Sequence, residues 1–367
     1  MTNLAHTAGI RLDNWRRANY RSVIARYYRA RRFFGLPTLK SVRWLSTLKC
    51  NFACRGCVAQ TDSTCGPELS TEEAESLVRE MAAMGVRTFE ITGGEPLLRP
   101  DLFHIIRLAN RLGIGVGVGT NSYLARHFES EFRRCRFQWI FTSIDGLRES
   151  SDAYRGRPGA FDRSIDALDL YREIGVPLRI VNTVVTPGNI DQLDDLYETI
   201  RQSGANLWHL APCLPLGGAA DNPGLRLDAE QFRRVIGFAA RRHNGPLKTE
   251  IIHTWGYMGE WDRLVHYRPT VCRAGIRLCA IMPDGEVLGY QVIYDNRHSQ
   301  GNIRERPLRE IWREEFRELR DPVIDQKCRR CEYFKSCAAG CWILRQNGHQ
   351  CLKHVWAGCS TGVEVAA

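Results

Sequence analysis

The strongest constraint on the fold is a regular alternation of apolar and helical segments between residues 42 and 212. Six segments have the length and the β-branched or aromatic content of buried strands: 42–48, 87–92, 113–120, 138–145, 178–185 and 206–212. Strands that alternate with helices pair in parallel through right-handed crossovers. Six such units are too few for a closed eight-stranded barrel. The sequence therefore predicts an α/β fold, a partial (β/α)6 barrel of the TIM type.

Helix-start signals support this pattern. Ser70-Thr71-Glu72-Glu73 has the form of a capping box, and it predicts a helix that runs to Gly85. Another helix is expected to begin at Pro100-Asp101.

Polar or glycine-rich turns follow most of the expected strands. They occupy residues 49–57, 92–96, 120–122, 143–146 and 211–218. In parallel barrels the C-terminal ends of the strands form one face, and that face carries the chemistry. A single turn of this kind would mean little, but several on one face predict a ligand site.

Cysteine usage points to metal or redox chemistry. The chain of 367 residues contains 14 cysteines. It lacks the apolar core of a secretion signal and any uncharged apolar run long enough to span a membrane. We therefore expect a cytoplasmic protein without a transmembrane segment, in which cysteines are poor candidates for disulfides.

Positive charge is concentrated at the N-terminus. Residues 1–49 carry eleven Lys or Arg and a single acid, Asp13, while the whole chain has a net charge of +10. We interpret residues 1–39 as a region with a basic amphipathic helix from Arg11 to Arg32. Such a helix either packs on the barrel with a solvated face or binds an acidic peptide or a membrane surface. Basic charge alone does not indicate nucleic acid, and we expect no such partner.

Three cysteines lie on the loop after the first expected strand: Cys50, Cys54 and Cys57. A structural zinc ion or an electron-transfer cluster normally takes four protein ligands. Three thiolates without a local fourth predict a [4Fe–4S] cluster with one iron open to a substrate or cofactor. The alternative is a zinc site completed by a distant Cys or His.

Cys50-x3-Cys54-x2-Cys57 after one strand, with Gly93-Gly94-Glu95-Pro96 after the next, resembles the radical S-adenosylmethionine (radical SAM) superfamily. The resemblance covers about residues 40–215. It implies that the open iron chelates the amino and carboxylate groups of SAM. Reductive cleavage of SAM then gives a 5′-deoxyadenosyl radical, which abstracts hydrogen from a substrate.

The same resemblance implies which residues surround SAM. It assigns contacts with SAM to Gly93, Gly94, Glu95, Pro96, Asn121, Ser143, Asp145 and Arg155. Among these, Glu95 is expected near the ammonium of SAM and Arg155 near its carboxylate. One position departs from the family, since the residue before the third cysteine is commonly aromatic and lies by the adenine, whereas here it is Gly56.

The C-terminal cysteines resemble a second family, the SPASM domain, which holds auxiliary [4Fe–4S] clusters. The pattern is Cys328-x2-Cys331-x5-Cys337-x3-Cys341, with Cys272 upstream and Cys359 downstream. The match covers about residues 267–360 and includes 301–312. We therefore divide the chain into residues 1–39, a radical SAM core at 40–250 and a SPASM domain at 251–367.

The resemblance also implies ligand sets for one or two auxiliary clusters. The distal cluster takes Cys328, Cys331, Cys337 and Cys359, and the proximal cluster takes Cys272, Cys279 and Cys341. Cys279 has an alternative interpretation as a small apolar strand residue. Cys351 has no place in the scheme.

Tyr290 stands where the family pattern has a further cysteine. The fourth site of the proximal cluster is then open, or is filled by Tyr290, Gln291, water or substrate. An open iron binds a substrate heteroatom, whereas a closed cluster only exchanges electrons.

Two reaction types remain open. In one, the substrate radical loses an electron to the auxiliary clusters, which gives an oxidation or a new cross-link. In the other, a cysteine thiol donates hydrogen from the opposite face and inverts a stereocentre; Cys213 is the candidate donor, with a small buried thiol as the alternative.

The expected substrate is a ribosomal peptide, and an aminoglycoside or sugar intermediate of antibiotic biosynthesis is the alternative. Expected partners are an electron donor such as flavodoxin or ferredoxin and a separate peptide-carrier protein. A non-enzymatic iron–sulfur electron carrier is a further alternative, but it leaves Gly93-Gly94-Glu95-Pro96 unexplained. Oligomeric state is open.

Overall fold

The computed structural model describes residues 38–59, 66–268, 270, 272–290, 298–337, 339–346 and 351–356. The expected basic helix from Arg11 to Arg32 lies outside the described residues, as do Gln291 and Cys359.

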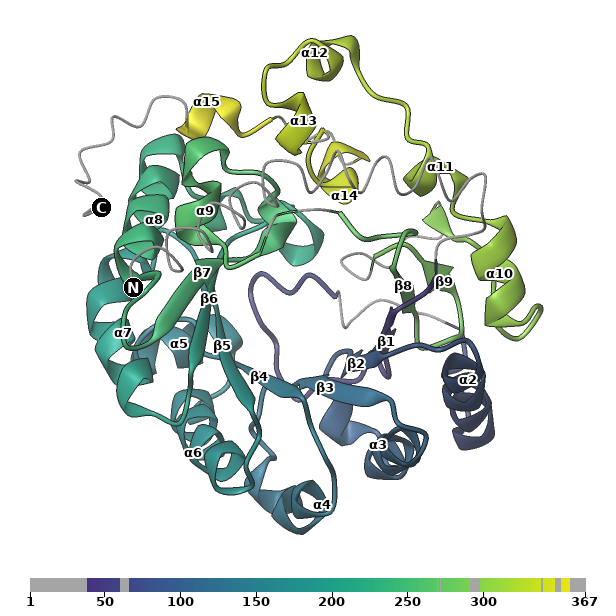
Figure 1. Cartoon of the computed structure of the whole chain (residues 1–367). Helices are drawn as coiled ribbons and strands as arrows, with labels where there is room; N and C mark the ends of the chain where they lie inside the picture. The colour runs from purple at the N-terminus through teal and green to yellow at the C-terminus, as the bar shows by residue number, and fades with distance from the viewer. Residues whose placement is uncertain are drawn as a thin grey trace, which may run out of the picture.

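A single sheet of nine strands organises the described residues, in the order β7-β6-β5-β4-β3-β2-β1-β8-β9. All six expected strands are present: β1 (Ser41–Leu45), β2 (Thr88–Thr92), β3 (Gly115–Gly119), β4 (Trp139–Ser143), β5 (Leu178–Val185) and β6 (Leu207–Pro212). Consecutive strands among them pair in parallel. Figure 1 shows them as an open arc with helices on its outer side, which confirms the partial barrel.

Three short strands extend this arc at its two edges. β7 (Lys248–Ile251) pairs in parallel with β6. At the other edge, β8 (Leu278–Ile281) pairs in parallel with β1, and β9 (Val287–Leu288) pairs antiparallel with β8. The sheet therefore continues into the region expected to form the SPASM domain.

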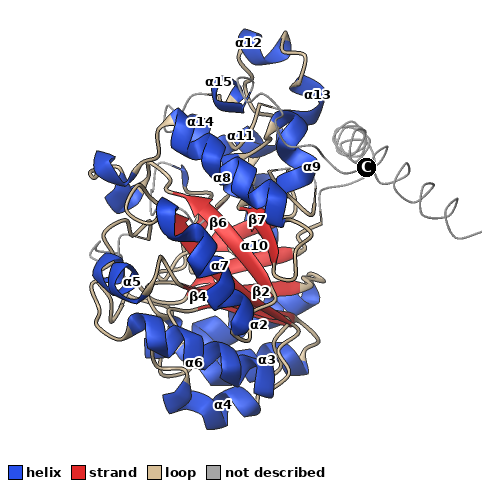
Figure 2. Ribbon diagram, turned by 90° about the vertical axis from the view of Figure 1, so that its left-hand side faces the viewer, coloured by secondary structure: helices blue, strands red, loops and turns tan. Residues whose placement is uncertain are grey.

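Helices cover the outer face of the sheet (Figure 2). In the barrel they are α2 (Thr71–Ala83), α3 (Leu102–Arg111), α4 (Glu129–Arg133), α5 (Arg148–Arg155), α6 (Ala160–Glu173), α7 (Leu193–Gln202), α8 (Ala229–Arg242) and α9 (Asp262–Val265). The expected capping box is present, because Ser70 caps α2 and Glu73 bonds back to the Ser70 amide. None of the described helices is long and apolar enough to cross a membrane.

The core lies between these helices and the sheet. Alternate strand residues such as Trp44, Phe89, Val116 and Ile140 are fully buried there. This is the pattern expected for strands of a barrel whose outer face packs on amphipathic helices.

The inner face of β3 consists of glycine. Backbone atoms of Gly117 and Gly119 lie against the rings of Trp139 and Phe141 on β4, and a Cβ at Gly117 would overlap the Trp139 indole. The "GVGVG" sequence thus combines outward valines for the core with inward glycines that leave room for two rings.

Short helices form the C-terminal region, and most of them lie along the upper side of the molecule in Figure 1. They are α10 (Leu308–Glu314), α11 (Arg317–Arg320), α12 (Gln326–Arg329), α13 (Phe334–Cys337), α14 (Trp342–Gln346) and α15 (Lys353–Trp356).

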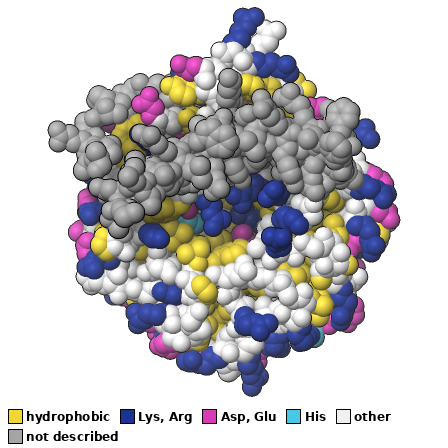
Figure 3. Space-filling view, in the orientation of Figure 1, with side chains coloured by type: hydrophobic (Ala, Val, Ile, Leu, Met, Phe, Trp, Pro, Cys, Tyr) yellow, Lys and Arg dark blue, Asp and Glu magenta, His cyan; other side chains and the backbone are white. Residues whose placement is uncertain are grey.

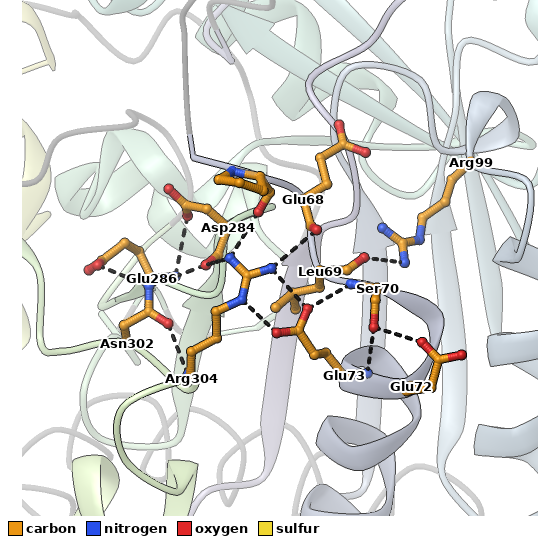
Figure 4. A network of polar contacts seen from close by, with 11 residues as sticks. Glu68, Leu69, Ser70, Glu72, Glu73, Arg99, Asp284, Glu286, Asn302 and Arg304 are labelled. Atoms are coloured by element: carbon orange, nitrogen blue, oxygen red, sulfur yellow. Dashed lines mark hydrogen bonds and ion pairs between the residues drawn. The ribbon is translucent and has the colours of Figure 1, made fainter.

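A polar network joins α2 to the segment after β8 (Figure 4). The Arg304 guanidinium donates from Nε and Nη2 to the two carboxylate oxygens of Glu73, at 2.6 and 2.8 Å. It also donates from Nη1 to the carbonyls of Pro67 and Asp284, at 2.9 and 3.1 Å. The hydrogen bonds from Arg304 and from the Ser70 amide lower the pKa of Glu73 to about 2, against the opposing effect of burial.

Candidate functional site

The cysteine loop follows β1, and the turn after β2 holds it from one side. The Gly94 amide donates to the Thr47 carbonyl and the Glu95 amide to the Lys49 carbonyl, both at 2.8 Å. A Cβ at Gly93 or Gly94 would overlap these carbonyls, so only glycine allows the approach. In the structure, these glycines therefore pack against the loop that carries the cysteines.

The Glu95 side chain is buried and holds this turn through hydrogen bonds. Its carboxylate accepts hydrogen bonds from the Leu97 amide, the Thr120 hydroxyl and the Asn121 amide, at 3.0, 2.7 and 2.7 Å. Complete burial raises the pKa of Glu95 to about 7, against the effect of these bonds. Pro96, also buried, begins a short 3-10 helix at Pro96–Leu98.

Asn121, at the end of β3, extends the network to the cysteine loop. Its Nδ2 donates to Asn51 Oδ1 at 2.7 Å. Ser143 is the last residue of β4 and pairs with Asn182 on β5.

The C-terminal end of α5 holds the loop from a second side. The amides of Ala53 and Arg55 donate to the carbonyls of Arg155 and Tyr154, at 3.3 and 3.0 Å. The Arg155 Nη1 lies 3.7 Å from Cys54 Sγ. α5 thus fixes both the backbone of the loop and the surroundings of one thiol.

Arg155 also forms a buried ion pair with Asp145. Asp145 accepts the Val184 amide at 2.6 Å, which ties the end of β4 to β5. Burial raises the pKa of Asp145, and the Arg155 charge opposes that shift. We read Asp145 as the support that orients Arg155 toward the cysteine loop.

The segment after β6 covers a third side. The Gly218 amide donates to the Cys57 carbonyl at 2.9 Å, and Asn222 Nδ2 donates to the Arg55 carbonyl at 3.4 Å. Cys213 begins this segment and is buried, and burial raises the pKa of its thiol to about 11.

The donor set fits a cluster. Burial raises the pKa of Cys50 to about 11, and the charges of Glu95, Cys54 and Cys57 contribute to that rise, so the three thiols lie near one another on the loop. In the part of the chain that the structure describes, no three His, Cys, Asp or Glu side chains converge as they would around one metal ion. A cubane needs no such convergence, because each thiolate binds a different iron.

The expected proximal ligands divide into two groups. Cys272, Cys341 and Tyr290 are partly buried and pack against one core. Cys279 is fully buried on β8, on the core-facing side beside Val42, and burial raises the pKa of its thiol. This position favours the interpretation of Cys279 as an apolar strand residue.

Tyr290 faces the barrel interior. Its hydroxyl lies 3.1 Å from Thr254 Oγ1, and its ring lies 5.4 Å from the guanidinium of Arg43 on β1. Arg43 in turn donates to Glu90 on β2 at 3.0 Å.

Among the expected distal ligands, Cys328 lies on α12 and Cys331 lies just after its end, and the Cys331 amide donates to the Cys328 carbonyl at 3.2 Å. Burial raises the pKa of Cys328, and the charge of Cys351 raises it as well. Cys351, which has no place in the expected ligand sets, therefore lies near Cys328. Cys337 ends α13.

Sequence reasoning missed a polar row inside the barrel. His209 Nδ1 lies 3.0 Å from Asn182 Oδ1, and His209 Nε2 lies 2.9 Å from the Glu250 carboxylate. Burial alone would raise the pKa of Glu250, but the hydrogen bond and charge of His209 lower it to about 2. The sequence does contain a sign of this row: Asn182 and His209 are polar residues within mostly apolar strands.

Lys and Arg side chains gather at the hollowed centre of the face seen in Figure 3, which has the same orientation as the open arc of strands in Figure 1. A basic opening favours ligands with negative groups.

Two family models match the chain. The radical SAM superfamily matches residues 44–200, and the SPASM iron–sulfur cluster-binding domain matches residues 272–332.

Individual proteins match over most of the chain. An AdoMet-dependent heme synthase of Oleidesulfovibrio alaskensis is 31% identical over 84% of this chain and 83% of its own length. The mycofactocin maturase MftC of Mycolicibacterium smegmatis is 29% identical over 85% of this chain and 80% of its own.

Among solved structures, Streptococcus suis SuiB bound to S-adenosylmethionine shares the fold with a TM-score of 0.69, at 18% identity over 85% of this chain and 75% of SuiB. The chain therefore belongs to the radical SAM superfamily, carries a SPASM domain, and is an enzyme whose cofactors are S-adenosylmethionine and iron–sulfur clusters.

Proposed function

We propose that this enzyme reductively cleaves SAM at a cluster held by Cys50, Cys54 and Cys57, abstracts hydrogen from a substrate, and acts on a ribosomal peptide. The observation that carries the proposal is the cysteine loop itself. Turns from β2, α5 and the segment after β6 hold its backbone at the C-terminal edge of the barrel. A loop fixed on three sides keeps its thiols in one place without a fourth protein ligand.

When bound, the cluster and SAM supply one electron and a carbon-centred radical. The protein residues orient and enclose them. Gly93 and Gly94 bring the β2 turn against the loop, and Asn121 and Arg155 approach it from β3 and α5. Glycine and apolar residues after Cys213 close over the loop, which limits the access of water.

The test is anaerobic incubation of the reconstituted full chain with SAM and dithionite. We expect 5′-deoxyadenosine from the wild type and none from Cys54→Ala. The matched control is Cys135→Ala, since Cys135 is also partly buried but bonds weakly to Phe103 on α3, away from the loop. Equal yields from the wild type and Cys54→Ala would contradict the proposal.

Support for a peptide substrate comes from the relatives. One is named a mycofactocin maturase, and SuiB has also been solved bound to its precursor peptide SuiA, at a TM-score of 0.67 and 19% identity over 88% of this chain and 76% of SuiB. For such a substrate, the basic opening of the barrel favours an acidic peptide segment.

A second candidate is a tetrapyrrole, because the heme synthase relative has 31% identity. Titration with iron-coproporphyrin III, the tetrapyrrole in the name of another relative, the Fe-coproporphyrin III synthase of Methanosarcina barkeri, distinguishes the two. A saturable shift of its main absorption band, followed by SAM-dependent conversion, would favour the tetrapyrrole; absence of both leaves the peptide proposal. The sugar intermediate, the flavodoxin or ferredoxin donor and the separate peptide carrier stay predictions.

A further inference from the structure

Gly56 stands where the family commonly has an aromatic residue, and a side chain from another part of the chain fills the space beside it. A Cβ at Gly56 would lie 2.5 Å from the hydroxyl oxygen of Tyr154 and 3.3 Å from Leu225 Cδ1. Tyr154 lies near the C-terminal end of α5, whose backbone already bonds to the cysteine loop. The phenol therefore points at the loop, at the residue just before Cys57.

The Tyr154 hydroxyl is buried without a partner. The residue is 7% exposed, and no hydrogen-bond partner for its oxygen exists among the described residues. Its ring packs with Cys213, Ala219 and Leu225, from the segment that closes over the loop. A buried hydroxyl without a partner costs free energy, so a bound ligand that offers an acceptor to this oxygen would be stabilised by it.

We propose that Tyr154 donates its phenolic hydrogen to the nucleoside part of bound SAM, and so takes over a contact that the loop cannot make at Gly56. The inference rests on the proposed SAM site. If the amino and carboxylate groups of SAM bind the open iron, its remaining acceptors are the adenine nitrogens and the ribose oxygens. Tyr154 is thus a binding residue for the cofactor, supplied by α5 instead of the cysteine loop.

Charge supports the direction of this hydrogen bond. Burial raises the pKa of Tyr154, and the carboxylate of Asp145 raises it further. The phenol consequently keeps its proton at any working pH and acts as a donor.

The first test is Tyr154→Phe, which removes only the hydroxyl. We expect a five- to ten-fold weaker affinity for SAM, measured by titration of the reconstituted wild type and variant, with an unchanged iron content. The thermal unfolding midpoint without SAM should not fall, because the lost oxygen has no protein partner. The increase of that midpoint on adding SAM should be smaller than for the wild type.

Tyr197→Phe is the matched control. Tyr197 is also a buried phenol against a glycine, since a Cβ at Gly245 would lie 2.6 Å from its oxygen. Its hydroxyl, however, accepts the Leu247 amide at 3.2 Å, far along the chain from the cysteine loop. We expect Tyr197→Phe to lower the unfolding midpoint and to leave the affinity for SAM unchanged.

The second test is Gly56→Ala, alone and with Tyr154→Phe. The methyl group displaces the phenol, so Gly56→Ala should weaken SAM binding about as much as Tyr154→Phe. The double variant should be no weaker than Gly56→Ala alone, since both changes remove one contact.

A Tyr154→Phe variant that binds SAM as tightly as the wild type would overturn the inference, as would strictly additive effects in the double variant. Either result leaves the proposed function standing if the wild type still forms 5′-deoxyadenosine. Wild-type protein that neither binds nor cleaves SAM would instead contradict the proposed function itself.

Discussion

At the residue scale, Cys213 and Tyr154 share one small apolar cluster beside the cysteine loop. In the structure Cys213 directly follows β6, and its role as a hydrogen donor stays a prediction. Burial raises the pKa of the Cys213 thiol to about 11, which keeps it protonated near neutral pH and able to donate hydrogen.

If the reaction is epimerisation, Cys213→Ala should abolish product formation and leave cleavage of SAM intact. Product and 5′-deoxyadenosine are measured in the same anaerobic assay. Cys135→Ala serves again as the control and should change neither yield. Unchanged product from Cys213→Ala would remove the epimerase interpretation while leaving the oxidative one.

Residue identity and spacing predicted which thiols to examine, but not which way each side chain points. Cys272 and Cys279 both fall within the resemblance to the SPASM domain, yet Cys279 faces the buried side of β8 next to Val42. That orientation depends on the register between β8 and β1, which joins residues far apart in sequence. Tyr154 could not be predicted for the same reason, because its contact with Gly56 depends on how α5 packs against the cysteine loop.

At the element scale, β3 shows how a strand adapts to its neighbour. Gly117 provides room for the Trp139 indole, and its backbone is held between β2 and β4.

Gly117→Ala should therefore lower the free energy of unfolding by about 2 kcal/mol, because the new methyl group forces the indole out of its position. Urea unfolding followed by tryptophan fluorescence measures the change. Gly224→Ala is the control, since a Cβ there meets nothing within 4 Å and no positive φ is involved. Equal stability of the two variants would contradict this account of the strand.

The six strands of the barrel were predictable because each is an apolar run between helical patterns. β7 and β9 have four and two residues, too few for periodicity to show, and β8, with four, was expected only through the alternative interpretation of Cys279 as a strand residue. Their place in the sheet follows from pairing with β6 and β1, which is tertiary information. The α2 capping box, by contrast, was predictable because all its parts lie within four residues.

At the scale of the whole molecule, Arg304 connects the region matched by the radical SAM model to the region matched by the SPASM model (Figure 4). Its two hydrogen bonds to Glu73 reach α2, and its contact with the Asp284 carbonyl reaches the segment after β8. Arginine alone offers this planar fork, because lysine has a single ammonium.

Arg304→Lys should lower the free energy of unfolding by about 1–2 kcal/mol, since one ammonium cannot replace the bidentate pair and the carbonyl contacts together. Amide hydrogen exchange should rise at the N-terminus of α2 and at residues 284–286 in the same variant. Arg313→Lys is the control: Arg313 is mostly exposed and pairs with its neighbour Glu314, so we expect almost no change.

The pH dependence of stability distinguishes loss of the Arg304–Glu73 contact from a general loss of packing. Arg304 and Ser70 hold the pKa of Glu73 at about 2, below the ordinary value of 4.5, so its ionised form favours the folded state. That contribution is complete above about pH 4.5 and is lost as pH falls toward 2. The stability difference between the wild type and Arg304→Lys should accordingly be constant from pH 7 to pH 5 and narrow below pH 4.5. A difference that stays constant into acid would show that Glu73 is not the partner through which Arg304 joins the two regions.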